Sequence, residues 1–224
     1  MRSNDYPCAT PLRLQLPGFD VAPFDVYSGY LTVPGPFEQS NYTSLKIHYQ
    51  FHASQNNPKT DPIASWHQGG PGSDSIAVGL YTEMGYFQVD SNGTYVNEHA
   101  WNNVASMLYL ESPAGSGGSS GFSECIVADK PVDCYWNDTS QAEAYAHSLT
   151  AFFDAFPEYK SNDFYLTVRQ CPFRPAQTIR TAVQLSRLYA YVPHAWLYAH
   201  TDTIVGCMLP RLHEYTQGES YAGQ

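Results

Sequence analysis

The sequence predicts an α/β fold built on a mixed or parallel sheet, because strand, helix and strand patterns follow one another along the chain. Two short apolar runs, 62–66 and 104–110, are bounded by Gly, Pro and Asn and suit central strands that are buried on both faces. An amphipathic helix pattern around 140–156 is followed by a short strand pattern at 163–166. The 224 residues suffice for one sizeable hydrophobic core.

Two further patterns predict strands outside this central group. Between residues 45 and 51 apolar and polar side chains alternate strictly, which is typical of a half-buried strand. The apolar members of this alternation are Leu45, Ile47, Tyr49 and Phe51. Segments 86–90 and 94–97 are joined by Ser-Asn-Gly and predict a hairpin, because Asn92 and Gly93 tolerate the positive φ of a tight turn.

The predicted helix is expected to begin near Ser140. Ser140 and Glu143 fit a capping box, in which each side chain satisfies an N–H group at the helix start. Pro157 is expected to end the helix. Its apolar face is formed by Ala142, Tyr145, Ala146, Leu149, Phe152, Phe153 and Phe156.

The composition is that of a globular protein, with 43% apolar and 14% charged residues. A net charge of −10 argues against a nucleic-acid partner, whose phosphates bind basic surfaces. No apolar run approaches the roughly 20 residues that a membrane helix needs, so no membrane span is expected. The five cysteines lack metal-ligand spacing, and neither a metal site nor a cofactor is predicted. Cys125 and Cys134 could close a short loop as a disulfide, with unpaired buried thiols as the alternative.

Three glycosylation sequons, at Asn41, Asn92 and Asn137, favour a protein of the secretory pathway, either secreted or lysosomal or vacuolar. The 18 tyrosines agree with that compartment. Residues 1–7 lack the apolar segment of a signal peptide. Either the export signal is missing from this sequence or the protein is not exported.

Two short motifs carry candidate chemistry. The segment 218–223, Gly-Glu-Ser-Tyr-Ala-Gly, is typical of a nucleophile elbow, in which Ser220 would sit on a sharp turn between strand and helix. Segment 66–72, Trp-His-Gln-Gly-Gly-Pro-Gly, follows a predicted buried strand, and its glycines allow backbone N–H groups to form an oxyanion hole. Taken singly, the first could be a glycine-rich tail and the second a plain turn.

Five motifs in one order together resemble the serine carboxypeptidase family, and they cover most of residues 12–167 as well as 218–224. The matching segments are 16–19 with 27–31, then 66–72, then 79–85, then 101–104 with 111–115, and finally 164–167 with 218–223. The resemblance implies an α/β-hydrolase fold with a central mixed sheet, here truncated, and hydrolysis of C-terminal residues from peptide substrates. It implies no cofactor and makes no prediction of oligomeric state.

The resemblance also implies roles for individual residues. Ser220 would be the acyl-forming nucleophile, and the backbone N–H groups of Gly70 and Tyr221 would form the oxyanion hole. The substrate's C-terminal carboxylate would be bound by Gln68, Gly69, Glu83 and Glu219. Two adjacent glutamates cannot both ionise cheaply, so one would keep a proton and donate it to that carboxylate. Glu83 could instead be an ordinary solvated charge.

This sequence departs from the family at several positions. Gln68 stands where the family has asparagine, and Ser73 replaces the usual cysteine. Residues 168–217 separate Thr167 from Gly218, which are adjacent in the family. This stretch carries five arginines and only two acidic residues, and its first and last codons, for Val and Gln, fit the two ends of an unspliced intron.

The chain is therefore divided into 12–167, the first part of a carboxypeptidase catalytic domain, an insert at 168–217, and the elbow motif at 218–224. The insert is interpreted as a translated intron outside the native fold, with a lineage-specific insertion as the alternative. Neither aspartate nor histidine follows Ser220, so this chain alone is expected to be inactive. Two alternative functions are an acyltransferase of the same family and a non-catalytic binding homologue.

Overall fold

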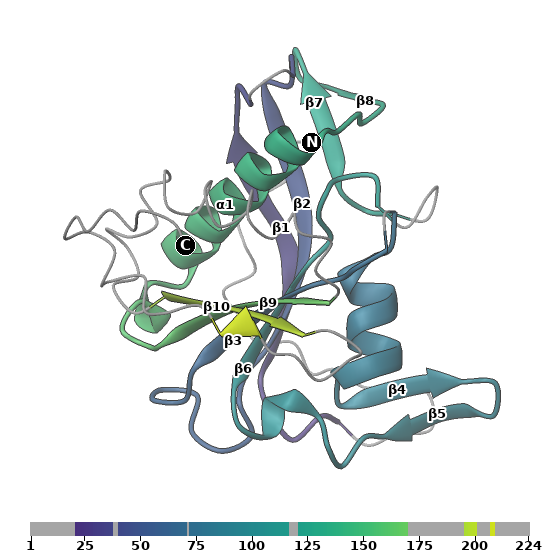
Figure 1. Cartoon of the computed structure of the whole chain (residues 1–224), viewed down its shortest axis with the longest axis vertical. Coiled ribbons are helices and arrows are strands. Elements are labelled where there is room, and N and C mark those ends of the chain that lie inside the picture. The colour runs from purple at the N-terminus through teal and green to yellow at the C-terminus, as the bar shows by residue number, and fades with distance from the viewer. Residues whose placement is uncertain are drawn as a thin grey trace, which may run out of the picture.

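The structure, a computed structural model, describes residues 21–37, 40–70, 72–116, 121–169, 195–200 and 207–208. For residues 168–169, 195–200 and 207–208 it describes the backbone alone. A mixed sheet of nine strands forms its centre, with helix α1 packed on one side and helix η1 on the other (Figure 1). A separate hairpin projects beside η1 (Figure 1). Within these residues no helix has the length and apolar character to cross a membrane.

The strands of the main sheet follow the order β11-β10-β9-β3-β6-β2-β7-β8, and β1 pairs with β2. Their bounds are β1 Val26–Pro34, β2 Ser44–His52, β3 Ile63–His67, β6 Ser106–Leu110, β7 Glu124–Val127, β8 Lys130–Val132, β9 Phe164–Arg169, β10 Ala195–His200 and β11 Cys207–Met208. The neighbours β10, β9, β3 and β6 run parallel, and the other pairs are antiparallel. The mixed sheet predicted from the sequence is confirmed.

The remaining elements are the π-helix η1 Ser75–Met84, the hairpin strands β4 Phe87–Asp90 and β5 Gly93–Val96, the short 3-10 turns η2 Trp101–Asn103 and η4 Pro157–Tyr159, and α1 Asp138–Ala155. The predicted hairpin is confirmed, and Gly93 takes a φ of 126° at its turn. The strands β1, β7, β8, β10 and β11 were not predicted as strands from local pattern.

The two faces of β3 and β6 lead to two different cores, because successive side chains of a strand point to opposite sides. Ile63, Leu108 and Leu110 pack toward α1, together with the alternating apolar residues of β2. Trp66 and Tyr109 pack toward η1 instead. Both faces of these strands are therefore buried, as the short apolar runs predict.

Aromatic rings dominate the α1 side of the sheet. Phe51 of β2 contacts the rings of Phe152, Phe156 and Tyr159 at centroid distances of 5.0, 5.7 and 5.0 Å. Each such pair contributes about 0.5–1.5 kcal/mol beyond the area that it buries. The predicted apolar face of the helix is the face that meets the sheet.

The helix starts earlier than the sequence analysis expects. Asn137 is the N-cap, and its side chain accepts the N–H groups of Thr139 and Ser140. Ser140 returns the interaction by accepting the N–H of Asn137, so the capping box joins Asn137 and Ser140 rather than Ser140 and Glu143. The prediction was wrong by one turn because asparagine caps as well as serine does.

Strand β9 continues beyond Thr167, the last residue before the predicted insert. Its backbone includes Val168 and Arg169, and residues 195–200 pair with it in parallel as β10. Most of 168–217, and all of 218–224, lie outside the described residues. The interpretation of 168–217 as an insert stays a prediction.

Candidate active site

The carboxyl ends of three parallel strands, β3, β6 and β9, meet at one edge of the sheet. In open α/β sheets this edge is where ligands bind. The loop that leaves β3 begins at Gln68, and the loop that leaves β6 begins at Glu111. The candidate site is therefore built on these two loops and on η1, which follows the first of them.

The loop after β3 turns through two glycines with positive φ, Gly70 at 82° and Gly72 at 87°. Side chains other than glycine rarely adopt this conformation. The N–H of Ser73 donates to the carbonyl of Gly70 over 2.8 Å and closes the turn. Gly70 itself is exposed.

Gln68 and Glu83, two predicted carboxylate-binding residues, lie together in the structure. Gln68 Nε2 donates to Glu83 Oε1 over 3.4 Å. Gln68 is 7% exposed, whereas Glu83 is half-buried near the end of η1. Gly69, the third member of the predicted set, directly follows Gln68, and the fourth, Glu219, lies outside the described residues with Ser220 and Tyr221.

The orientation of the Gln68 amide is set by Trp66. The indole Nε1–H of Trp66 donates to Gln68 Oε1 over 2.8 Å. Gly79 of η1 makes room for this contact, because a Cβ at that position would lie 2.5 Å from Trp66 Cδ1 and 3.2 Å from Gln68 Oε1. The sequence alone gave no role to Trp66 or Gly79. The pattern that could have pointed to them is their position in the motifs 66–72 and 79–85.

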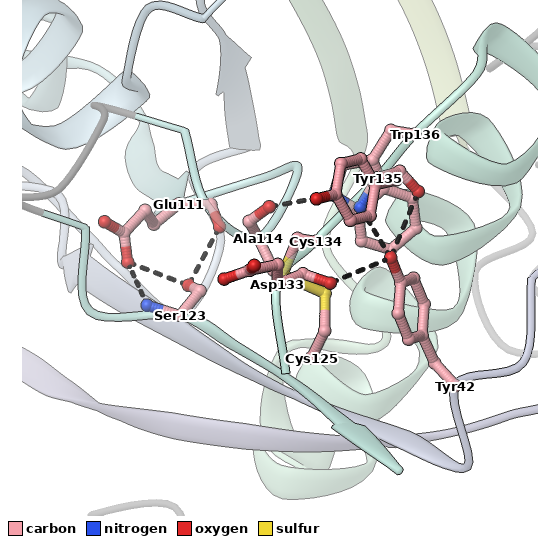
Figure 2. Close-up of a disulfide and its surroundings, with 9 residues drawn as sticks. All are labelled: Tyr42, Glu111, Ala114, Ser123, Cys125, Asp133, Cys134, Tyr135 and Trp136. Atoms are coloured by element: carbon pink, nitrogen blue, oxygen red, sulfur yellow. Dashed lines mark hydrogen bonds between the residues drawn. A yellow bond between two sulfur atoms is a disulfide. The ribbon is translucent and has the colours of Figure 1, made fainter. Parts of the chain in front are cut away.

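Glu111 is a buried carboxylate that the sequence analysis did not select. It is 1% exposed and accepts the N–H of Phe122 at 2.8–2.9 Å. It also accepts the N–H of Ser123 at 2.7 Å and the Ser123 hydroxyl at 2.8 Å (Figure 2). Burial raises the pKa of Glu111, and the Asp74 carboxylate adds to that rise, while the hydrogen bonds act against it. The carboxylate ties the loop after β6 to the start of β7.

A disulfide joins Cys125 of β7 to Cys134, with 5.6 Å between their Cα atoms (Figure 2). Of the two alternatives left open by the sequence, the disulfide is the one found. Close by, the indole of Trp136 donates to the carbonyl of Ala114 over 2.8 Å. Tyr42 donates its hydroxyl to the carbonyl of Tyr135 over 3.2 Å. These contacts fasten the segment before α1 to β7, to the loop after β6 and to the segment between β1 and β2.

His67, at the end of β3, points to the α1 side rather than to the Gln68 side. Its Nε2 lies 3.3 Å from Gln141 Nε2, and its ring packs edge-on against Tyr145 at 5.0 Å. Burial lowers the pKa of His67 to about 4. Among the described residues no cluster of His, Cys, Asp and Glu could hold a metal ion.

The three sequon asparagines, Asn41, Asn92 and Asn137, are all exposed. Asn92 lies in the turn of the projecting hairpin, and Asn137 caps α1. Exposure is required of a glycosylation acceptor. Their modification stays a prediction.

Comparison with known proteins assigns a family to this arrangement. The family model described as serine carboxypeptidase matches residues 17–168. The mouse lysosomal protective protein is 41% identical over 155 residues, which cover 68% of this chain and 29% of the mouse protein. Serine carboxypeptidase-like 40 of Arabidopsis thaliana is 35% identical over 163 residues, covering 68% of this chain and 28% of the plant protein. The chain thus spans about three-tenths of the length of these relatives.

Among solved structures, a prohormone-processing carboxypeptidase of Saccharomyces cerevisiae superposes with a TM-score of 0.60 at 20% sequence identity. The match covers 79% of this chain and 38% of the yeast chain. At this identity the superposition supports the fold alone, an α/β-hydrolase sheet. The family match covers more than half of the sequence and includes the Gln68 loop, η1 and the Glu111 loop, so the chain belongs to the serine carboxypeptidase family.

Proposed function

We propose that the protein carrying this chain is a serine-type carboxypeptidase that releases C-terminal residues from peptides through an acyl-enzyme. The observation that carries the proposal is the Gln68–Glu83 pair at the carboxyl edge of the sheet, beside the positive-φ loop at Gly70. An amide donor and a carboxyl group at hydrogen-bonding distance suit the binding of a free carboxylate. Family membership supports the same activity.

In the proposed reaction the Ser220 hydroxyl attacks the carbonyl carbon of the last peptide bond. A general base takes the hydroxyl proton and returns it to the leaving amine, and water then releases the acyl group from Ser220. The backbone N–H groups of Gly70 and Tyr221 stabilise the negative oxygen of the tetrahedral intermediate. The carboxylate of the leaving residue is held by Gln68, Gly69, Glu83 and Glu219.

The proposed carboxylate site requires one proton that is shared between Glu83 and Glu219. With both groups ionised, the site would repel a substrate carboxylate, whereas one protonated carboxyl donates a hydrogen bond to it. Binding should therefore weaken as the pH rises and this proton is lost. An enzyme of this kind works best in an acidic compartment.

A secretory-pathway location agrees with the disulfide, which persists in oxidising compartments, and with the three exposed sequons. One relative is named as lysosomal. We propose that this protein is likewise secreted, lysosomal or vacuolar.

The test uses the longer protein that carries this chain. Ser220→Ala should abolish release of the C-terminal residue from a blocked dipeptide while product binding by calorimetry persists, since loss of a triad member removes most of the catalysis. Retention of activity within about tenfold of the parent would show that another residue is the nucleophile. Turnover of an acyl-glucose donor with an alcohol, without peptide hydrolysis, would favour the acyltransferase alternative.

The 224-residue chain by itself is proposed to be inactive and poorly soluble. Ser220 has no histidine after it to accept its proton, and a sheet without its remaining cover leaves apolar surface and a strand edge open. Expression of residues 1–224 alone checks both properties. A monodisperse monomer that unfolds cooperatively would overturn the folding claim, and hydrolysis that disappears with Ser220→Ala would overturn the catalytic claim.

A further inference from the structure

The loop that would supply the oxyanion hole is tied to η1 by one buried serine. Ser75 is the first residue of η1 and is fully buried. Its Oγ accepts the backbone N–H of Gln68 over 3.2 Å. The bond joins the residue that leaves β3 to the first turn of the helix, and the turn at Gly70 lies between them.

The helix start that holds Ser75 is itself fixed. Asp74 is the N-cap of η1, and its carboxylate accepts the N–H groups of Ile76 at 2.8 Å and Ala77 at 3.1 Å. A cap of this kind stabilises a helix start by about 1 kcal/mol. The hydroxyl that accepts the Gln68 N–H therefore belongs to a helix whose first turn is held in place by its cap.

We propose that Ser75 is a positioning residue for catalysis, which sets the place of the Gly70 N–H by holding the Gln68 backbone. This inference rests on the proposed function. Gly70 follows Gln68 by two residues, so a shift of the Gln68 backbone moves the Gly70 donor. An oxyanion hole acts only when its donors are held where the negative charge develops, and a misplacement of about 1 Å can cost about 100-fold in rate.

The Gln68 side chain has a separate anchor, which makes the inference testable. Its Oε1 accepts from Trp66, and its Nε2 reaches Glu83. Loss of the Ser75 hydroxyl removes only the backbone tie and leaves both side-chain contacts in place. Substrate carboxylate binding should therefore survive while the rate of the chemical step falls.

The experiment compares variants of the longer protein on a blocked dipeptide. Ser75→Ala should lower kcat by about 10-fold to 100-fold, with KM and product affinity changed by less than about threefold. A peptide phosphonate, whose charged oxygen occupies the oxyanion position, should lose inhibitory affinity in parallel with kcat. Ser75→Cys fills the same space with a weak acceptor and should show the same loss if Ser75→Ala does not fold.

Ser148→Ala is the matched control. Ser148 is also fully buried and its hydroxyl also bonds a backbone group, the carbonyl of Ala144 at 2.7 Å, but within α1. Equal kcat values for the Ser75 and Ser148 variants would overturn the inference, as would a loss confined to KM. If the parent protein shows no hydrolysis that depends on Ser220, both the proposed function and this inference are overturned. If the parent is active and the Ser75 variants are as active as the parent, only this inference is overturned.

Discussion

The indole N–H of Trp66 donates to Gln68 Oε1 over 2.8 Å, and this contact decides which end of the Gln68 side chain faces Glu83. An indole nitrogen can only donate, so the amide must present its oxygen to Trp66 and its NH₂ group to Glu83. Glutamine is one methylene longer than the asparagine of the family motif. The longer side chain keeps its donors at the site because Trp66 holds its oxygen.

Trp66→Phe should therefore weaken recognition of the substrate carboxylate. Without the indole donor the amide can rotate, and we expect KM for a peptide with a free C-terminus to rise about fivefold to tenfold, since one neutral hydrogen bond contributes roughly 1 kcal/mol. Trp136→Phe is the control, because Trp136 also donates its indole N–H, to the Ala114 carbonyl. Equal KM values for the two variants would show that Trp66 acts only by packing.

The cap of α1 and the glycosylation of Asn137 can be separated by substitution. Asn137→Ala should lower the free energy of unfolding by about 1 kcal/mol, because the N–H groups of Thr139 and Ser140 lose their acceptor. Asn137→Asp removes the sequon but keeps an acceptor, and Thr139→Ala removes the sequon alone. Mass spectrometry should show loss of one glycan in all three, and thermal unfolding should single out Asn137→Ala. An unglycosylated parent would contradict the sequon prediction.

Stability below neutral pH should depend on His67. Burial lowers its pKa from 6.5 to about 4, so the folded state holds His67 neutral while the unfolded state binds a proton below pH 6.5. The contribution of neutral His67 to the free energy of unfolding is therefore fully present above pH 6.5. It is lost as the pH falls toward 4, at roughly 1.4 kcal/mol per pH unit. The partners that face the ring, Gln141 and Tyr145, offer no negative charge there.

The measurement is denaturant unfolding of the parent and of His67→Leu between pH 8 and pH 5. The difference at pH 8 gives the packing effect of the substitution alone. Between pH 8 and pH 5 the free energy of unfolding of the variant should rise by up to about 2 kcal/mol relative to that of the parent. A difference that stays constant over this range would show that His67 is not buried in the neutral form. The raised pKa of Glu111 stabilises the folded state as the pH falls, which is opposite to the effect of His67. Because Glu111 is present in both proteins, this effect leaves the difference between their free energies of unfolding unchanged.

Transcripts of the gene should test the origin of residues 168–217. If this stretch is a retained intron, sequencing of cDNA should find messages in which the Thr167 codon is followed directly by the Gly218 codon. In the spliced protein the elbow would then follow β9 at the carboxyl edge, beside the end of β3. Healthy cells that contain only the unspliced message would favour a lineage-specific insertion.

Much of the sheet could be predicted from local sequence. Burial on one face of β2 selects every second residue, so the alternation of Leu45, Ile47, Tyr49 and Phe51 encodes the strand, and all four are fully buried. The strands β1, β7, β8, β10 and β11 were missed. β8 has no buried residue to mark it, and in β1 polar or glycine positions interrupt the apolar pattern.

The sequence by itself determined the strands with strong periodicity, the helix face, the positive-φ loop and the family. Only the tertiary structure decided that Trp66 orients the Gln68 amide, that Ser75 accepts the Gln68 backbone N–H, and that the Glu111 carboxylate accepts the N–H groups of Phe122 and Ser123. The physical reason is that periodicity reports which face of an element is buried. The distance between two polar side chains depends instead on how η1 packs against β3 and how the loop after β6 returns, and no repeat in the sequence specifies that packing.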